Sequence, residues 1–337
     1  MKSKLATALV VLAAGSSALG AQATPSPVLV ALSKTDLTLA IVDPATLKVV
    51  GKVPSGPDPH EVVVSADGRE AYISNYGGGA YHTLTVIDLV NRKSLRTVEL
   101  GALRGPHGLD VAGGKIWFTA EAAKAIGSYD PVTNQVDLIL GTGQTGTHMI
   151  AVWNEHGNMV TSNIGSASLT FFEPVMRAGR GAGSAPQRDW NEIVVAVGRG
   201  VEGFDFSPGG RELWVANAQD GTISVIDPVS KTVTATLTAN VSGANRLKFT
   251  PDGKLVFVSM LRSSDVAIFD ATTRRELRRV QVGRGAAGIQ MQPDGRRVFV
   301  ACTPDDYIAV IDLTSLEVVG RLDVGHQPDG MAWAVHR

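Results

Sequence analysis

The sequence predicts an all-β fold, a seven-bladed β-propeller with four antiparallel strands in each blade. Three observations predict it. One short motif recurs seven times, successive copies stand 42–45 residues apart with one spacing of 54, and each repeat divides into four short apolar segments separated by turn residues. A repeat of about 40–45 residues that contains four strands is typical of a propeller blade.

The recurring motif consists of two or three apolar residues followed by an acid, and a proline often comes next. The apolar residues predict the third strand of each blade, and the acid marks the end of that strand. The seven acids are Asp43, Asp88, Asp130, Glu173, Asp227, Asp270 and Asp312.

The second repeat illustrates the four strands, which are expected over residues 61–65, 71–75, 84–88 and 93–100. Asp67-Gly68 predicts the first hairpin turn, because glycine tolerates the positive φ of such turns. The two ends of the chain complete each other: residues 330–335 predict an innermost strand, and residues 28–32 predict the strand beside it. Together with 37–43 and 48–53 they would form one blade, which closes the ring within a single domain of residues 24–337.

The first 23 residues resemble a secretory signal peptide. Lys2 and Lys4 precede an apolar run over residues 5–14, and Ala21-Gln22-Ala23 predicts cleavage after Ala23. We therefore expect a periplasmic or secreted protein. The apolar run is shorter than the roughly 20 residues that span a bilayer, and no later segment is longer, so no membrane span is expected.

The net charge limits the possible partners, and the cysteine content limits the possible disulfides. The formal net charge is −1, and it becomes −3 when Lys2 and Lys4 are removed with the signal peptide, which argues against nucleic acid as a partner. Cys302 is the only cysteine, so no intramolecular disulfide can form and stability must come from the core. A closed ring leaves no obvious apolar edge, and we expect a monomer.

Two predicted strands, residues 213–217 (LWVAN) and 298–302 (VFVAC), resemble the strand that names the YVTN-type β-propeller repeats. The resemblance covers nearly all of residues 27–337 and implies the seven-bladed fold. The superfamily includes lactonases, lyases, cofactor-holding propellers and binding proteins. The resemblance therefore implies a lactonase-like or lyase-like reaction class, but fold alone does not decide activity.

One position of the repeat is chemically informative. Aligning the repeats on their turns identifies the residue just before each innermost strand, which is expected to line one mouth of the axial channel; we call this face the top. In chain order these residues are His60, His107, His148, Glu202, Asn245, Ala287 and Asp329. Imidazole and carboxylate groups are the ligands of Zn, Fe, Mn, Ni and Cu ions in proteins.

The sequence therefore predicts a divalent transition metal held by His60, His107, His148 and Glu202. Glu202 is the predicted fourth ligand or general base, and Asp329 or Asn245 would orient the substrate or a proton. Arg246 is expected either to bind a carboxylate or phosphate of the substrate or to be a surface charge. The three-histidine set departs from the Glu, Asn and Asp sites of lactonase-type propellers and is more similar to propeller lyases and oxygenases that use a transition metal.

Two functions remain open at this point. The first is a metal-dependent hydrolase or lyase that acts on a small molecule at the top of the axial channel. The second is a non-catalytic propeller whose metal-free polar pocket binds a ligand or a protein partner through the same face. A Gly-, Arg- and Ala-rich insertion at residues 174–190 explains the long spacing and is expected on the bottom face, as a flexible solvated loop or a partner-docking loop.

Overall fold

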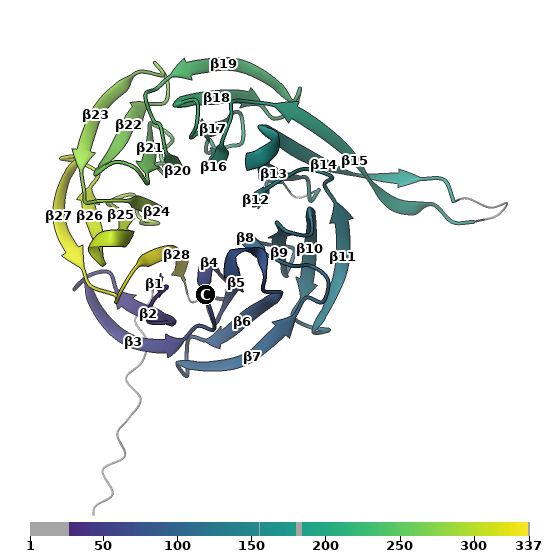
Figure 1. Ribbon diagram of the computed structural model, residues 1–337, viewed down its shortest axis with the longest axis horizontal. Helices are drawn as coiled ribbons and strands as arrows, with labels where there is room; N and C mark the ends of the chain where they lie inside the picture. The colour runs from purple at the N-terminus through teal and green to yellow at the C-terminus, as the bar shows by residue number, and fades with distance from the viewer. Residues whose placement is uncertain (1–26, 155, 180–183, 336–337) are drawn as a thin grey trace, which may run out of the picture.

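The computed structural model describes residues 27–154, 156–179 and 184–335. The proposed signal peptide, residues 1–23, lies outside these ranges. The described residues form seven four-stranded antiparallel sheets arranged in a ring, so the predicted seven-bladed propeller is confirmed (Figure 1). Three short 3₁₀ turns, η1 (Gly77–Gly79), η2 (Ile164–Ser166) and η3 (Thr303–Asp305), are the helical elements of this part of the chain.

Each blade begins with its innermost strand at the axis and ends with its outermost strand at the rim. Blade 1 contains β28 (Pro328–Ala334), β1 (Val28–Ser33), β2 (Thr38–Asp43) and β3 (Lys48–Pro54). Blade 2 contains β4 (Pro59–Val64), β5 (Glu70–Asn75), β6 (Thr83–Asp88) and β7 (Lys93–Glu99). Blade 3 contains β8 (Pro106–Ala112), β9 (Lys115–Ala120), β10 (Ala125–Asp130) and β11 (Gln135–Gly141).

The other four blades follow the same order. Blade 4 contains β12 (Thr147–Val152), β13 (Met159–Asn163), β14 (Ser168–Arg177) and β15 (Gln187–Ala196). Blade 5 contains β16 (Val201–Phe206), β17 (Leu213–Asn217), β18 (Thr222–Asp227) and β19 (Thr232–Thr238). Blade 6 contains β20 (Ala244–Phe249), β21 (Leu255–Met260), β22 (Asp265–Asp270) and β23 (Glu276–Gln281). Blade 7 contains β24 (Ala286–Met291), β25 (Arg297–Cys302), β26 (Tyr307–Asp312) and β27 (Glu317–Leu322).

The two ends of the described chain meet in blade 1. Strand β28 pairs antiparallel with β1, with Leu29 opposite Trp333 and Val30 opposite Ala332. The adjoining top loops are joined as well, because the Asp36 carboxylate accepts hydrogen bonds from the backbone and the ring of His326. The predicted ring closure by both termini is thus confirmed, and β1 is paired on both of its edges, with β28 and with β2.

The hydrophobic core lies between neighbouring blades. Each second strand is buried along almost its whole length, because side chains on both of its faces pack against an adjacent sheet. In blade 5, for example, Trp214 and Val225 pack with Leu247 and Val258 of blade 6. The outermost strands alternate half-buried and exposed residues, as expected of strands with one face in water.

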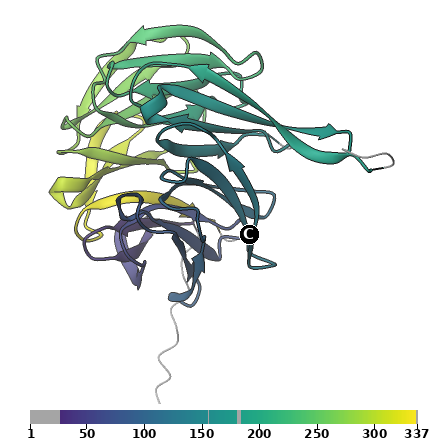
Figure 2. The same cartoon turned by 45° about the vertical axis from the view of Figure 1, so that its right-hand side comes forward.

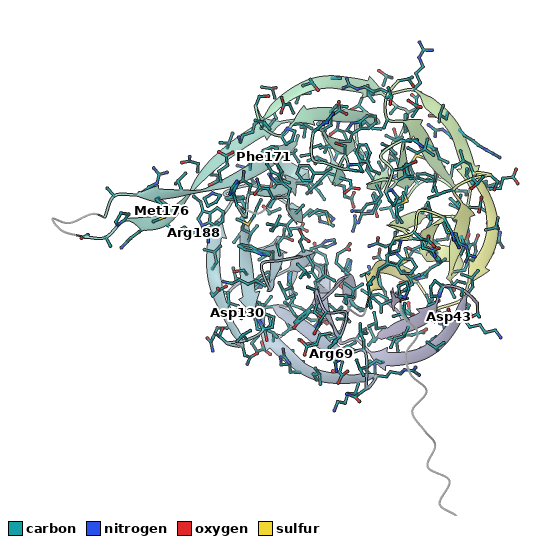
Figure 3. All side chains as sticks on the ribbon, turned by 180° about the vertical axis from the view of Figure 1, so that it is seen from behind. Asp43, Arg69, Asp130, Phe171, Met176 and Arg188 are labelled. Carbon is teal, nitrogen blue, oxygen red and sulfur yellow. The ribbon has the colours of Figure 1, made fainter. Side chains whose placement is uncertain are left out.

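The recurring acid has a structural role at the bottom turn between the third and fourth strands. Asp88 accepts hydrogen bonds from the backbone N–H groups of Val90 and Asn91, each at 2.9 Å. Asp43 and Asp130 occupy the same position in their blades, and Figure 3 shows them near the rim. These bonds satisfy backbone donors that would otherwise be unpaired in the turn.

Blade 4 departs from this pattern, because Glu173 replaces the aspartate and the strand continues. Strands β14 and β15 are ten residues long and pair as far as Arg177 opposite Gln187. The resulting hairpin projects beyond the ring in both ribbon views (Figures 1 and 2). The expectation of a flexible solvated loop over residues 174–190 is therefore wrong for its strand segments, because backbone pairing orders them.

None of the helices in the described residues is long and apolar enough to cross a membrane.

Candidate functional site

All seven predicted axial positions line one cavity at the top of the ring. The cavity measures about 350 Å³, and its wall also contains Lys34, Tyr76 and Arg246. The seven positions are His60, His107, His148, Glu202, Asn245, Ala287 and Asp329. Residues far apart in the sequence meet here because each stands at the beginning of an innermost strand, where the blades converge on the axis.

Hydroxyl groups on the second strands hold the axial residues in place. Thr119 on β9 accepts a hydrogen bond from the Gly108 N–H of its own blade at 2.9 Å and donates to the His148 carbonyl of the next blade at 2.7 Å. Serines on the second strands of blades 2, 4 and 6 donate in the same way to the axial carbonyls of the following blades: Ser74 to His107, Ser162 to Glu202 and Ser259 to Ala287. The axial backbone is thus bonded from two blades at once.

The residue that follows each axial position is a glycine in four blades and a large side chain in the other three. Glu61, Met149 and Arg246 occupy blades 2, 4 and 6, while blades 1, 3, 5 and 7 carry glycine. A Cβ at Gly108 would stand 2.5 Å from the His148 carbonyl oxygen, so the neighbouring strand leaves no room for one. The glycines allow adjacent strands to approach closely, and the large side chains between them fill the space below the axial residues.

Three imidazoles form one cluster in the cavity wall. The His107 and His148 rings lie 3.8 Å apart between centroids with planes tilted by 32°, and His60 lies 5.1 Å from His107. Tyr76 contacts both His60 and His107 edge-on. Burial, followed by the charges of neighbouring cations and imidazoles, holds the pKa of His107 well below its usual value, and burial and Lys34 lower the pKa of His60.

His148 differs from its neighbours because it lies between two carboxylates. Its Nδ1 is 3.2 Å from Glu121 and its Nε2 is 3.6 Å from Glu202. Burial opposes protonation, but the two glutamates outweigh it and raise the pKa of His148. The cluster therefore combines an imidazole whose pKa is lowered, His107, with one whose pKa is raised, His148.

Arg246 spans the axis beneath the cluster. Its guanidinium pairs with Glu61 of blade 2, on the far side of the ring from blade 6, and lies 3.9 Å from Glu202 of blade 5. The surface-charge alternative for Arg246 is therefore wrong, because only 9% of its side chain is exposed. Asn245 donates to Glu202 at 2.6 Å, which places the axial carboxylate between an amide, an imidazole and a guanidinium.

A second cation lies nearer the mouth of the cavity. Lys34, in the loop between β1 and β2, places its ammonium 2.8 Å from Nε2 of His60 and 3.4 Å from the Asp329 carboxylate. Burial raises the pKa of Asp329, and the Lys34 charge opposes that rise. Sequence comparison of the repeats missed Lys34, because it belongs to a loop and not to the aligned axial position.

Several groups in the wall have no hydrogen-bond partner among the described residues. The buried atoms are Nδ1 of His107, Oδ1 of Asn245 and Nε2 of His148, which lies 3.6 Å from Glu202 and so beyond hydrogen-bond distance. An unpaired buried polar atom costs about 1–3 kcal/mol, so native proteins keep few of them without a reason. Three of the nine such buried atoms among the described residues lie in the wall of this one cavity.

The four predicted metal ligands share the cavity but are not arranged around one point. Among the described residues, no group of three or more His, Cys, Asp or Glu side chains is set to hold a metal ion. The His107 and His148 rings lie against each other, with centroids 3.8 Å apart, and Lys34 occupies the Nε2 side of His60. Coordination by His60, His107, His148 and Glu202 would require these side chains to move, and metal binding stays a prediction.

Other polar residues at the top face lie outside the cavity. Asn75, Asn163 and Asn217 are fully buried and bond hydroxyl groups of the third strand in their own blades, so they stabilise the sheet. His82 pairs with Glu99, and Arg284 pairs with Asp305, in both cases on the exposed surface. These residues do not contribute to the cluster.

Comparison with known proteins supports the fold. No family model matches the chain, and no curated protein matches its sequence. A protein of unknown function from Desulfotomaculum acetoxidans has a similar structure, with a TM-score of 0.74 and 14% identity over 92% of this chain and 99% of that one. A candidate 6-phosphogluconolactonase from Bacteroides fragilis gives a TM-score of 0.72 and 16% identity over 93% of this chain and 99% of that one.

A third similar structure is the dihydro-heme d1 dehydrogenase NirN in complex with DHE. The TM-score is 0.64 and the identity 18%, and the match covers 91% of this chain but 65% of that one. At such identities a structural likeness shows the fold alone. The solved relatives therefore agree with the seven-bladed architecture, and the activity must be argued from the cavity itself.

Proposed function

We propose that this protein is a hydrolase or lyase that binds a small polar molecule in the axial cavity and transfers protons to and from it. The observation that carries the proposal is His107. The residue is 4% exposed and lies at the cavity among charged side chains; its ring contacts two other imidazoles, and its buried Nδ1 has no hydrogen-bond partner among the described residues. Keeping an unpaired imidazole buried is costly, which favours a functional role.

The neighbours of His107 support acid–base chemistry. Groups whose surroundings push their pKa values in opposite directions are suited to act as acid and base in one site. Here burial lowers the pKa of His107, whose ring lies against that of His148, and Glu121 and Glu202 raise the pKa of His148 against the effect of burial. In this arrangement His107 is the candidate base, and the His148–Glu202 pair is the candidate proton donor.

The remaining residues position these groups. Arg246 and Asn245 both contact Glu202 and fix its carboxylate against His148. Because the Arg246 guanidinium is already paired with Glu61, it is better suited to hold Glu202 than to bind a substrate carboxylate. Lys34 and Asp329 stand at the mouth, where they would contact polar groups of an entering molecule.

A transition metal is not needed for this proposal. A bound Zn, Fe, Mn, Ni or Cu ion would supply Lewis-acid chemistry or an activated water if the imidazoles rearranged to hold it. Elemental analysis of the purified protein, obtained without a His-tag or chelator, tests this point directly. About one equivalent of metal, lost in His107→Ala and retained in His82→Ala, would show that the predicted ligands do bind an ion.

The catalytic proposal is tested by turnover. A panel of lactones, esters and hydroxy acids would be screened by thermal shift, and each molecule that stabilises the protein would be followed by NMR for conversion. We expect His107→Gln and Glu202→Gln to lower turnover by about 10²–10⁴-fold, the usual contribution of general acid–base groups. His82→Gln is the matched control and should retain wild-type rates.

The alternative is a non-catalytic propeller that binds its ligand through the same face. It is favoured if a molecule binds with saturation, weakens on His107→Gln substitution and is released unchanged. Turnover that persists within about twofold in both His107→Gln and Glu202→Gln would place catalysis elsewhere and reject the axial site.

A further inference from the structure

A second cavity lies at the bottom of the ring, between blades 3 and 4, far from the axial cluster along the strands. It measures about 640 Å³, compared with about 350 Å³ for the axial cavity. Its wall combines residues from the first hairpin of blade 3 with residues from the outermost strand of blade 4. No predicted function of the axial site requires this space.

Two departures from the repeat create the cavity. The bottom turn between the first two strands has five or six residues in blades 2, 4, 5, 6 and 7, but in blade 3 it consists of Gly113 and Gly114 alone. Both glycines have positive φ, of 61° and 75°, which allows this tight turn. The short turn leaves space at the bottom of blade 3, and residues of the lengthened β14–β15 hairpin of blade 4 line that space.

The hairpin contributes an aromatic ring and a cation to the wall. The Arg188 guanidinium lies over the Trp190 ring at 4.9 Å, and Figure 3 shows Arg188 at the base of the projecting hairpin. Trp117 also lines the cavity, and its indole N–H donates to the Ala112 carbonyl at 3.2 Å. Leu138 adds apolar surface. Two indoles and aliphatic groups suit a flat, apolar ring.

Among the described wall residues, one positive charge lacks a carboxylate partner. Lys115 pairs with Asp137, whose carboxylate also accepts a hydrogen bond from Ser128 at 2.6 Å. Arg188, in contrast, is an exposed residue that has no carboxylate partner among the described residues, and its guanidinium lies over the Trp190 ring. A guanidinium binds a carboxylate through two parallel hydrogen bonds, because the two groups match in geometry.

We propose that this cavity is a second ligand site, which binds a small aromatic carboxylate. The ring of the ligand packs against Trp190 and Leu138, and its carboxylate pairs with Arg188. The site is independent of the axial cavity, since no residue is common to the two walls. It is also specific to this blade, because the repeat builds neither the short turn nor the long hairpin elsewhere.

The test uses the mature protein, naphthalene-2-carboxylate and its neutral analogue naphthalene-2-carboxamide, measured by isothermal titration calorimetry. We expect saturable binding of the carboxylate and at least about tenfold weaker binding of it by Arg188→Gln, because the charged hydrogen bonds are lost. The amide should bind more weakly than the carboxylate to the wild type and change little in Arg188→Gln. Arg177→Gln, farther along the same hairpin, is the matched control and should bind like the wild type.

Two further variants separate this site from others. Leu138→Trp fills the cavity without removing Arg188 and should abolish binding of both compounds, and circular dichroism would verify that it folds. His107→Ala should leave binding unchanged. The proposal is overturned if the wild type shows no saturable binding up to about 10 mM ligand, if Arg188→Gln binds the carboxylate normally, or if His107→Ala removes binding, which would place the ligand at the axis.

Discussion

Two positions of the same repeat illustrate different uses of a blade. The acid at the bottom rim is aspartate in six of the seven blades, and it accepts backbone hydrogen bonds of its own turn, as Asp88 and Asp130 do. The axial position at the top comprises five residue types in seven blades, and its side chains contact residues of other blades. Both positions occur once per blade, but only the rim position carries an acidic side chain in every blade.

This difference in residue variety indicates the role of each position. A turn makes the same local demand in every blade, so one residue type serves all of them. The axial residues converge on one cavity, where each must complement the others, and identical side chains would give seven like charges or seven unpaired groups. Uniformity across the repeat therefore indicates a role in folding, and variation at a convergent position indicates a site.

The largest expected effect concerns Arg246. Arg246→Met leaves Glu61 and Glu202 without their shared cation in a buried place, which should lower the free energy of unfolding by about 3 kcal/mol in urea titrations. Arg199→Met, which breaks an exposed pair with Asp220, is the control and should leave the urea midpoint unchanged. Equal losses of unfolding free energy in the two variants would contradict the distinction between the buried axial pair and the exposed pair.

Thr119 tests the hydroxyl groups that hold the axial backbone. Thr119→Val keeps the shape of the side chain but leaves the His148 carbonyl and the Gly108 N–H without their bonds. We expect a loss of about 2 kcal/mol in chemical denaturation and weaker binding of any axial ligand, because His148 is no longer fixed. Thr236→Val on the exposed outermost strand β19 should change neither measurement.

Asp88 tests the rim position. Asp88→Ala removes an acceptor of two backbone N–H groups and should cost about 1 kcal/mol, while axial ligand affinity stays at the wild-type value. Burial opposes the shift, but hydrogen bonds from Asn91 and Val90 lower the pKa of Asp88. A carboxylate with a lowered pKa stabilises the folded protein above its unfolded pKa, and this stabilisation is lost as the pH falls. The difference in unfolding free energy between Asp88→Ala and the wild type should therefore shrink below about pH 4.

The smallest expected effect is at the ring closure. The hydrogen bonds from His326 lower the pKa of Asp36 to about 2, and Asp36 in turn raises the pKa of His326. The stabilisation by this pair should therefore be lost as the pH falls from about 4 toward 2 and Asp36 is protonated. It should also be lost as the pH rises above the usual pKa of histidine and His326 is deprotonated. Melting curves of Asp36→Asn and wild type should differ slightly at pH 5 and converge in high salt, because the pair is exposed.

The fold was largely predictable because its determinants are local and repeated. The apolar strands, the Asp turns and the complementary chain ends such as Val30 and Ala332 each follow from short-range pattern. The candidate site was predictable in part, since the axial residues could be aligned by their turns. Lys34 and Glu61 were missed because neither occupies that aligned position, and the extension of β14 and β15 was missed because its composition suggested a loop.

The sequence by itself determined seven blades, their closure and the set of side chains that reach the axis, because each depends on residue order within a repeat. Only the tertiary structure decided how those side chains meet. It stacks His107 on His148, pairs Arg246 with Glu61 across the channel, and opens a cavity where a short turn adjoins a long hairpin. Such contacts join residues of different blades, and their geometry depends on the packing of the whole ring.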